Sequence, residues 1–214
     1  MENKAFKDSD SWYYNVEKDI LYPYIPEGPN IILDIGCGSG MLGRNLLKLN
    51  KAESLIGVEI YKPAAIKAEK YYNKVYNQDI EQLNLEYHNY FDFIICGDIL
   101  EHLKDPWIIL KKIRNWLKRQ GNIIITIPNI RYWYILKELM LKGIWKYSDA
   151  GILDKTHLRF FTRRTINQII REEKYILIIS KMIIHGKKKN VLNKLTYRFF
   201  EEFLGSQILV IAKK

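Results

Sequence analysis

Three glycines at alternate positions, placed directly after an apolar run, constrain the fold of this chain more than any other feature. The run 31–35 has the composition of a buried parallel strand, and Gly36, Gly38 and Gly40 separate it from a helix-forming stretch. Backbone that lacks Cβ atoms can approach a nucleotide-like ligand closely, and a strand–turn–helix unit with such a turn is a common binding site. Gly38, Gly40 and Gly43 also match a dinucleotide fingerprint, so the glycines alone do not identify the ligand.

Four carboxylates extend this argument, because each of them ends one of four successive apolar runs. They are Asp34, Glu59, Asp79 and Asp98. Ligands of open parallel sheets bind at the carboxyl ends of the strands, so we expect these side chains to surround one crevice. Their negative charges would repel a pyrophosphate. They would instead stabilise a ligand that carries an ammonium group, a sulfonium, ribose hydroxyls and an adenine amine.

Four segments of the chain, taken in order, resemble the motifs of class I S-adenosylmethionine-dependent methyltransferases. They are Leu33–Gly40 with the sequence LDIGCGSG, Gly57–Glu59, Asp79-Ile80, and Phe91-Asp92 followed by Glu101-His102-Leu103. The resemblance is strong over residues 10–130 and looser beyond them. It implies that the chain binds S-adenosyl-L-methionine and releases S-adenosyl-L-homocysteine. It says little about the methyl acceptor.

The resemblance also implies how the cofactor is held. Asp34 and the glycines of the turn would hold the methionine end, and the two oxygens of Glu59 would accept both ribose hydroxyls. Asp79 would accept from the adenine amine, with the Ile80 amide nearby. Buried carboxylates at strand ends need partners of this kind. The full set of expected cofactor-binding residues is Asp34, Gly36, Cys37, Gly38, Gly40, Glu59, Ile60, Asp79, Ile80 and Asp98.

Strands and helices alternate along the chain, which predicts an α/β fold with a doubly wound parallel sheet and right-handed crossovers. The expected strands are 31–35, 54–59, 75–78, 91–97, 123–128, 175–184 and 206–212. The expected core helices are 41–50, 63–72, 106–119 and 163–173, the last capped by Thr162. Together with the resemblance, this pattern predicts a Rossmann-like seven-stranded sheet of order 3-2-1-4-5-7-6 with strand 7 antiparallel. We expect a single methyltransferase domain over residues 1–214.

Two appendages flank the predicted core. Residues 9–25 are expected to form an N-terminal helix. In the resembled family such a segment often closes over the cofactor, which here would bring Tyr13 and Tyr14 near it. Residues 186–205 form a basic, aromatic connection between the last two strands, with a helix expected around 191–203.

An insertion at 129–162 interrupts the alternation and is rich in aromatic residues. Long insertions in compact domains are commonly lids or binding loops, so we interpret this one as a helical lid that binds the acceptor over the carboxyl ends of the fourth and fifth strands. The alternative is a helix packed on the sheet edge or on a second subunit. One face of its expected helix carries Trp133, Leu136, Met140 and Leu141.

Two histidines are candidate catalytic residues. His157 lies in a Thr-His segment, and similar segments recur in small-molecule O-methyltransferases, including many near surface-polysaccharide pathways, so it is our candidate general base. The alternative is a hydrogen-bonded structural histidine. His102, with Asp98 and Glu101, resembles the Glu-x-x-Glu-His metal motif of ubiquinone-biosynthesis and small-RNA O-methyltransferases. Because Asp98 is shorter than Glu, and Glu-His-Leu also occurs in metal-free relatives, we expect no bound metal.

Composition limits the partners and the cellular compartment that we expect for this chain. The formal net charge of +10 makes nucleic acid and membrane surfaces partners to consider, although no single helix carries a continuous basic stripe. No apolar run is long enough for a membrane span, the first residues do not resemble a signal peptide, and Cys37 and Cys96 provide no disulfide framework. We therefore expect a cytoplasmic protein, with peripheral membrane contact and a homodimer as further interactions.

These observations favour an enzyme that methylates a hydroxyl of a small polar acceptor, and we expect a sugar or glycan of a surface-polysaccharide pathway. One alternative is a quinone-like phenol methylated with a metal at Asp98, Glu101 and His102. An RNA methyltransferase is favoured only by the net charge, and the chain lacks the Asn-Pro-Pro-Tyr motif of amine methylation. A non-catalytic subunit that keeps the cofactor fold is disfavoured, because the carboxylate set is complete.

Overall fold

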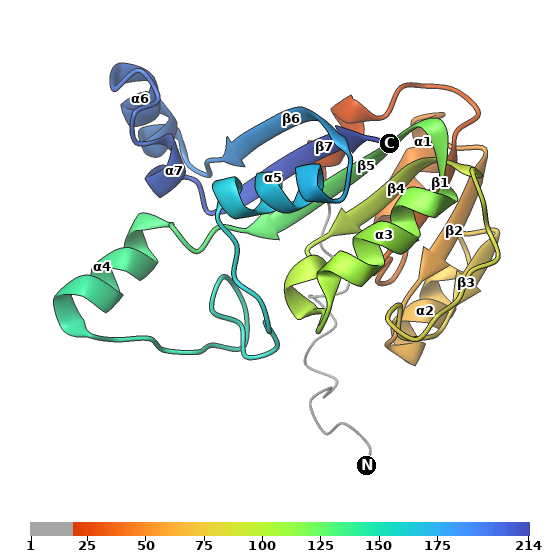
Figure 1. The fold of residues 1–214 in the computed structure, drawn as a ribbon, viewed down its shortest axis with the longest axis horizontal. Coiled ribbons are helices and arrows are strands. Elements are labelled where there is room, and N and C mark those ends of the chain that lie inside the picture. Colours follow the sequence, from red (N-terminus) through yellow and green to blue (C-terminus); the bar gives the residue numbers. More distant parts are fainter. Residues whose placement is uncertain (1–18) are drawn as a thin grey trace, which may run out of the picture.

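A single seven-stranded sheet organises the computed structural model, which describes residues 19–214 (Figure 1). The strand order is β3-β2-β1-β4-β5-β7-β6. Neighbouring strands are parallel from β3 to β5, whereas β7 runs antiparallel to both β5 and β6. The strands are β1 (Ile31–Ile35), β2 (Ser54–Val58), β3 (Lys74–Tyr76), β4 (Phe91–Gly97), β5 (Leu117–Pro128), β6 (Ile176–Ile183) and β7 (Gln207–Lys213). The predicted fold class, strand order and antiparallel seventh strand are confirmed.

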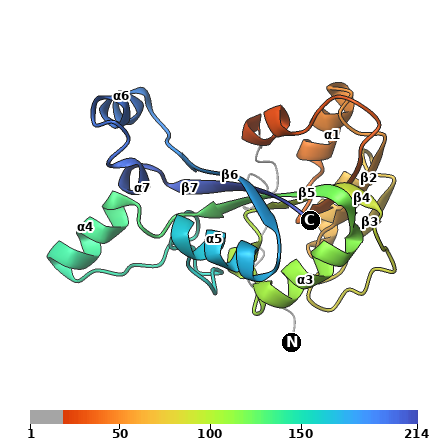
Figure 2. The same cartoon turned by 45° about the horizontal axis from the view of Figure 1, so that its top comes forward.

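Helices cover both faces of this sheet, which therefore has two hydrophobic cores. Figure 2 shows α1 on one face and α3 and α5 on the other. The core helices are α1 (Met41–Lys48), α2 (Lys62–Ala68), α3 (Pro106–Trp116) and α5 (Arg163–Glu172). Leu46 of α1 and Ile113 of α3 are fully buried, each in a different core. The Thr162 side chain accepts from the Thr165 amide and caps α5, as predicted.

The boundary between α3 and β5 differs from the prediction. We expected the helix to continue to about 119 and the strand to begin at 123, whereas α3 ends at Trp116 and β5 begins at Leu117. Leu117 is fully buried and pairs with Phe91, and the register of the two strands shifts between Phe91 and Phe93. The helical spacing of the sequence is thus overridden by burial of Leu117 against the neighbouring strand.

The N-terminal segment is described only in part. Of the expected helix 9–25, residues 9–18 lie outside the described residues, and so do Tyr13 and Tyr14. Asp19–Tyr24 form a short 3-10 helix with Pro23 inside it. Leu21 and Ile25 are fully buried in the same core as α1, so this segment covers that face of the sheet.

The insertion and the basic connection both form helices that extend away from the sheet (Figures 1 and 2). The insertion contains α4 (Trp133–Lys142), none of whose residues is buried. The connection contains α6 (Lys187–Leu195) and α7 (Glu201–Leu204) in place of the single helix expected over 191–203. Tyr197 and Arg198 adopt left-handed backbone conformations, which end one helix before the other begins. Among the described residues no helix has the length and apolarity that a bilayer span requires.

Candidate functional site

The turn after β1 is built from left-handed glycines. The φ angles of Gly36, Gly38 and Gly40 are 75°, 55° and 86°, a region that side chains with a Cβ rarely adopt. A Cβ on Gly40 would lie 2.9 Å from the Cα of Ala68, and one on Gly36 would overlap the side chain of Ile99. The glycines therefore let this turn pack against α2 and against the residue that follows Asp98.

Glu59 anchors this turn from the end of β2. The residue is 5% exposed, and its carboxylate accepts two backbone amides, from Gly38 at 2.9 Å and from Tyr61 at 2.8 Å. Burial raises the pKa of Glu59, and the two amides oppose that rise. Each carboxylate oxygen has a further lone pair, so the group keeps the capacity to accept two ligand hydroxyls. The Asn77 side chain, which the sequence analysis did not single out, donates to the carbonyls of Glu59 and Ile60 and so holds the backbone that follows β2.

Asp34 lies beneath the glycine turn, with a tyrosine that sequence reasoning missed. The Tyr72 hydroxyl donates to the Asp34 carboxylate at 2.6 Å and accepts the Gly43 amide at 3.1 Å. Burial, and after it the Asp34 charge, raise the pKa of Tyr72 well above its usual range, so the hydroxyl keeps its proton. A Cβ on Gly43 would lie 2.4 Å from the Tyr72 ring, which explains the small residue there. That third glycine of the fingerprint was the only sequence signal for this contact.

Asp79 and its neighbours lie after β3, as predicted. The Asp79 carboxylate accepts the Glu81 amide at 2.9 Å and so closes the turn that follows. Ile80 is buried, whereas Ile60 is 61% exposed. These two isoleucines thus differ in what they offer a ligand, because one packs into the core and the other presents its side chain to solvent.

Asp98 directly follows β4 and has a strained backbone conformation. Its φ is 55°, which is uncommon for a residue other than glycine and which Asp tolerates better than most. Its carboxylate accepts from the side-chain amide of Gln207, the first residue of β7, at 2.6 Å. Nothing in the local sequence pattern pointed to Gln207, which lies 109 residues away.

The strand register brings these acids to one edge. Ile35 of β1 pairs with Val58 of β2 and with Cys96 of β4. Asp34, Glu59 and Asp98 therefore all lie within a few residues of the same carboxyl edge, and Glu59 donates its amide to the Tyr76 carbonyl of β3. The predicted gathering of the carboxylates is thereby supported for the ends of three parallel strands.

A second group of residues gathers just beyond Asp98. Leu100–His102 form a short 3-10 helix after β4, and Glu101 on it is 1% exposed. His157 Nε2 lies 4.0 Å from Glu101 Oε1, and the rings of His157 and His102 have centroids 4.7 Å apart. Ligand atoms of Glu101, His102 and His157 all lie within 4.8 Å of one another. The structure therefore brings both candidate catalytic histidines to one buried carboxylate.

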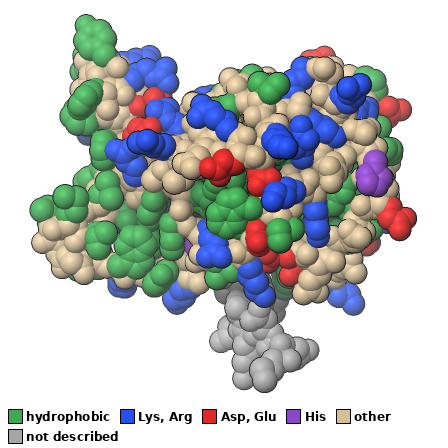
Figure 3. Space-filling model, viewed as in Figure 1, with side chains coloured by type: hydrophobic (Ala, Val, Ile, Leu, Met, Phe, Trp, Pro, Cys, Tyr) green, Lys and Arg blue, Asp and Glu red, His purple; other side chains and the backbone are tan. Residues whose placement is uncertain are grey.

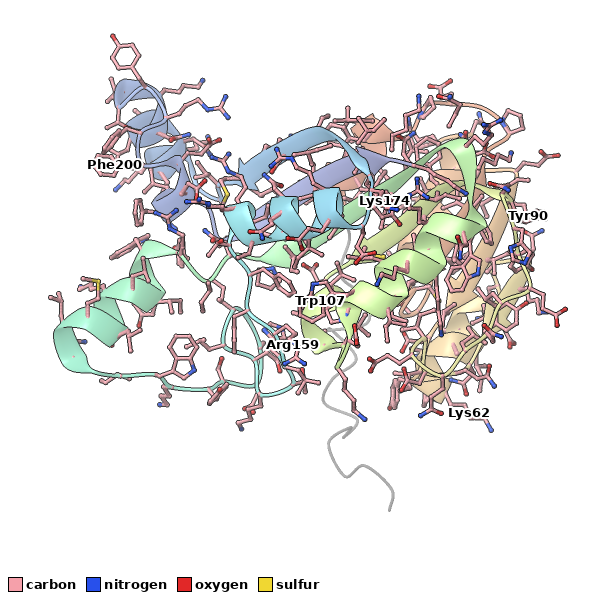
Figure 4. The ribbon with its side chains drawn as sticks, viewed as in Figure 1. Lys62, Tyr90, Trp107, Arg159, Lys174 and Phe200 are labelled. Carbon is pink, nitrogen blue, oxygen red and sulfur yellow. The ribbon has the colours of Figure 1, made fainter. Side chains whose placement is uncertain are left out.

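The segment that carries His157 is held on this 3-10 helix by its backbone. The amides of Leu158 and Arg159 both donate to the Glu101 carbonyl, at 2.8 and 3.0 Å. Arg159 also lies over the ring of Trp107 on α3, 6.0 Å from its centroid (Figure 4). Residues 152–161 are thus docked on the end of β4 even though α4, earlier in the same insertion, extends away from the sheet.

The two histidines are held by different partners. His157 Nδ1 lies 3.0 Å from the Ile152 carbonyl, which can only accept, so this nitrogen carries the proton and Nε2 is the basic one. His102 Nδ1 lies 3.3 Å from the Thr156 carbonyl. Burial, and after it the neighbouring His157, lower the pKa of His102, so His102 is neutral at pH 7.

Comparisons with known proteins identify the family to which the chain belongs. A family described as a methyltransferase domain matches residues 17–174, which is more than half of the chain. A curated relative, the ubiquinone biosynthesis O-methyltransferase of Xanthomonas euvesicatoria pv. vesicatoria, is 30% identical over 102 residues, which are 46% of this chain and 43% of the relative. The chain thus matches less than half the length of the curated relatives.

Solved structures share the whole fold. A SAM-dependent methyltransferase from Archaeoglobus fulgidus is similar with a TM-score of 0.69 at 23% identity, and 92% of each chain is covered. An S-adenosylmethionine-dependent methyltransferase from Mesorhizobium loti is similar with a TM-score of 0.64 at 15% identity, over 92% of this chain and 96% of that one. At these identities the similarity shows a shared fold and no more.

Proposed function

The chain belongs to the methyltransferase-domain family and is a class I S-adenosylmethionine-dependent methyltransferase, and we propose that it methylates a hydroxyl oxygen of a small acceptor. The proposal is carried by one observation. Glu101, His102 and His157, from two segments about 55 residues apart in the chain, gather at the end of β4, with His157 Nε2 4.0 Å from the Glu101 carboxylate.

The residues around the glycine turn fit the cofactor. The turn has no Cβ atoms at Gly36, Gly38 and Gly40, and the Glu59 carboxylate lies buried beside it with acceptor capacity for two hydroxyls. Glu59 would hold the ribose, and Asp79 would hold the adenine amine. When bound, S-adenosylmethionine supplies an electrophilic methyl group on a sulfonium.

His157 acts as the general base in this proposal. Its Nδ1 proton is held by the Ile152 carbonyl, so Nε2 would take the proton of the acceptor hydroxyl as the oxygen bonds to the methyl carbon. The methyl–sulfur bond would break in the same step, and S-adenosylhomocysteine would leave with the electron pair on sulfur. The imidazolium that results is stabilised by the Glu101 carboxylate, because a positive and a negative charge about 4 Å apart attract strongly in a buried site. His102 packs against His157 and, being neutral, adds no competing charge.

A sugar or glycan hydroxyl is the acceptor that we favour. The Trp145 and Phe160 rings meet edge to face with centroids 5.4 Å apart, and Phe160 lies 6.4 Å from the His157 ring. Aromatic faces beside a base provide stacking surface for a sugar ring. We place the reaction in the cytoplasm, which agrees with two buried cysteine thiols, Cys37 and Cys96.

A phenol-like acceptor with a divalent cation is the second candidate, and two observations favour it. One carboxylate and two imidazoles have ligand atoms within 4.8 Å of one another, a donor set that divalent metals accept. The curated relative carries the name of a ubiquinone biosynthesis O-methyltransferase. The donor set differs from the Asp98, Glu101 and His102 of the sequence analysis, because Asp98 accepts from Gln207 and His157 takes its place.

The ligand atoms of Glu101, His102 and His157 would have to move closer together to bind a metal ion. Nitrogen ligands of a tetrahedral metal lie at about 2.1 Å from it and hence about 3.4 Å from each other. Titration of the protein with Mg²⁺ and Zn²⁺ by calorimetry tests the set without reference to activity. Micromolar binding that Glu101→Gln abolishes would support the metal candidate, and no binding would reject it.

The experiment that tests the proposal measures S-adenosylhomocysteine release with acceptor panels of nucleotide sugars, glycans, catechol-like phenols and small primary amines. We expect turnover with a hydroxyl acceptor, and a loss of kcat of about 100-fold or more in His157→Ala, since general-base catalysis contributes about 10²–10⁴-fold. His88→Ala, an exposed histidine, is the matched control and should behave as the parent. Unchanged kcat in His157→Ala would reject His157 as the base, and turnover confined to amine acceptors would reject O-methylation.

A further inference from the structure

Two helical arms carry large apolar side chains that face solvent. We define the first arm as residues 132–147, which include α4, and the second arm as residues 187–200, which include α6. Side chains at the tips are extensively exposed: Met140 is 79%, Leu141 75%, Leu195 72%, Tyr197 95% and Phe199 78% exposed. Figure 3 shows hydrophobic side chains gathered over both arms, and Figure 4 shows Phe200 on the second arm, beyond the sheet.

Polar contacts tie the roots of the arms together. The Asn129 side chain, fully buried, donates to the carbonyls of Glu202 and Gly205, at 2.7 and 2.8 Å. Arg131 pairs with Glu202 at 2.8 Å, and Lys189 lies over the Tyr132 ring, 4.9 Å from its centroid. Figures 1 and 2 both show the arms at the same end of the sheet. These contacts therefore join the roots of the two arms at one end of the sheet, while the apolar tips contact solvent.

The charge of this surface is positive. The acidic side chains on the arms and just beyond them are already paired: Glu138 with Lys142 at 2.9 Å, Glu201 with Arg198 at 2.6 Å, and Glu202 with Arg131. Basic side chains that lie exposed on the arms are Lys137, Lys142, Lys146, Lys187, Lys188, Lys194 and Arg198. An exposed set of aromatic and aliphatic side chains flanked by lysines is the composition of a segment that lies in a membrane interface.

We propose that the two arms bind the surface of an anionic phospholipid bilayer. The apolar tips would enter the boundary between headgroups and acyl chains, and the lysines would contact the anionic headgroups. Trp133, Tyr134 and Tyr147 are 39%, 51% and 47% exposed, and such side chains favour the headgroup level. A second copy of the chain would bring a second positive surface to the same place, so charge complementarity favours the bilayer over self-association.

The first arm leads into the segment that carries His157, so a bound bilayer would lie on the acceptor side of the site. The experiment is flotation of the full chain with vesicles of phosphatidylcholine alone and with 30% phosphatidylglycerol, a composition of about one anionic lipid in three. We expect binding to the anionic vesicles that weakens at least tenfold between 50 mM and 500 mM NaCl, an order-of-magnitude expectation from screening.

Two sets of variants separate the apolar and the charged contributions. Met140→Ser, Leu141→Ser and Leu195→Ser combined should weaken vesicle binding at least tenfold, an order-of-magnitude expectation from the apolar groups removed. Lys187→Gln, Lys188→Gln and Lys194→Gln combined should remove the preference for anionic lipid. The controls are the pair Ile66→Ser with Ile176→Ser and the pair Lys67→Gln with Lys70→Gln. These exposed residues lie outside the arms, in or just after α2 and in β6, and the variants should bind as the parent.

Absence of binding to anionic vesicles, or equal binding by the triple serine variant, would overturn the proposal. A dimer in size-exclusion chromatography that the same serine changes convert to monomer would also overturn it, because the surface would then be an interface between two copies. Each measurement reads lipid binding or mass, so its result does not depend on the acceptor.

Discussion

The glycine turn and the two arms invert the usual relation between polarity and burial. At the turn, Asp34 and Glu59 are charged side chains with exposures of 2% and 5%, and each has hydrogen-bond partners within the fold. On the arms, Met140 and Tyr197 are 79% and 95% exposed. Buried charge and exposed apolar surface both cost free energy, so neither region is arranged for stability alone. The comparison fits the two roles that we propose, binding of the cofactor at the turn and of an anionic bilayer at the arms.

The largest effect is expected from removing the carboxylate at the turn. Glu59→Ala should weaken S-adenosylmethionine binding by about 100-fold or more, because hydrogen bonds to a charged group contribute about 1.5–3 kcal/mol each. Isothermal titration calorimetry measures the change. Glu69→Ala is the control. This glutamate is exposed and lies directly after α2, and the variant should bind as the parent. Equal affinity of Glu59→Ala and the parent would show that the buried carboxylate has a structural role only.

The next effect is expected at the tyrosine beneath the turn. Tyr72→Phe should lower the free energy of unfolding by about 1–3 kcal/mol, because the Asp34 carboxylate loses a donor in a buried site. Urea denaturation measures this, with Tyr90→Phe as the control on a ring that is 38% exposed. A change as small in Tyr72→Phe as in the control would remove the argument that this hydroxyl supports the turn.

The pH dependence of stability should report on His102. Its pKa is lowered in the folded state, chiefly by burial, so the unfolded chain binds more protons once the pH falls below the ordinary value of 6.5. Stability should therefore decline as the pH falls from 6.5 toward the lower folded-state pKa, by at most about 1.4 kcal/mol per pH unit for one proton. Urea midpoints at pH 7.5 and 5.5 test this in the parent and in His102→Gln, in which the decline should be smaller. An equal decline in both proteins would assign the proton to another group.

The smallest effect is expected on the arms. Met140→Ser and Leu141→Ser should change the free energy of unfolding by less than about 0.5 kcal/mol each, because exposed side chains contribute little to folding. Thermal or urea denaturation measures this. A loss above about 1 kcal/mol would mean that the arm packs on the body of the protein, and the contrast with the glycine turn would fail.

The local sequence predicted the carboxylates of the site, but not the side chains that hold them in place through hydrogen bonds. Glu59, Asp79 and Asp98 follow strands whose apolar composition is readable, so their places near the carboxyl edge followed from alternation. Tyr72 and Gln207 were missed, because each acts through a partner 38 or 109 residues away and neither belongs to a pattern of its own segment. The α3–β5 boundary was misplaced for a similar reason, since Leu117 pairs with a distant strand.

The sequence by itself determined the α/β alternation, the glycine turn and the order of the carboxylates, because hydrophobic periodicity and glycine's backbone freedom act within a few residues. Only the tertiary structure decided which side chains meet. It brought His157 to Glu101 in place of Asp98, tied Asp98 to Gln207, and placed α4 and α6 away from the sheet at the same end of the molecule. Such pairings depend on strand register and on contacts between distant segments, and their free energies are gained only when the whole sheet has formed.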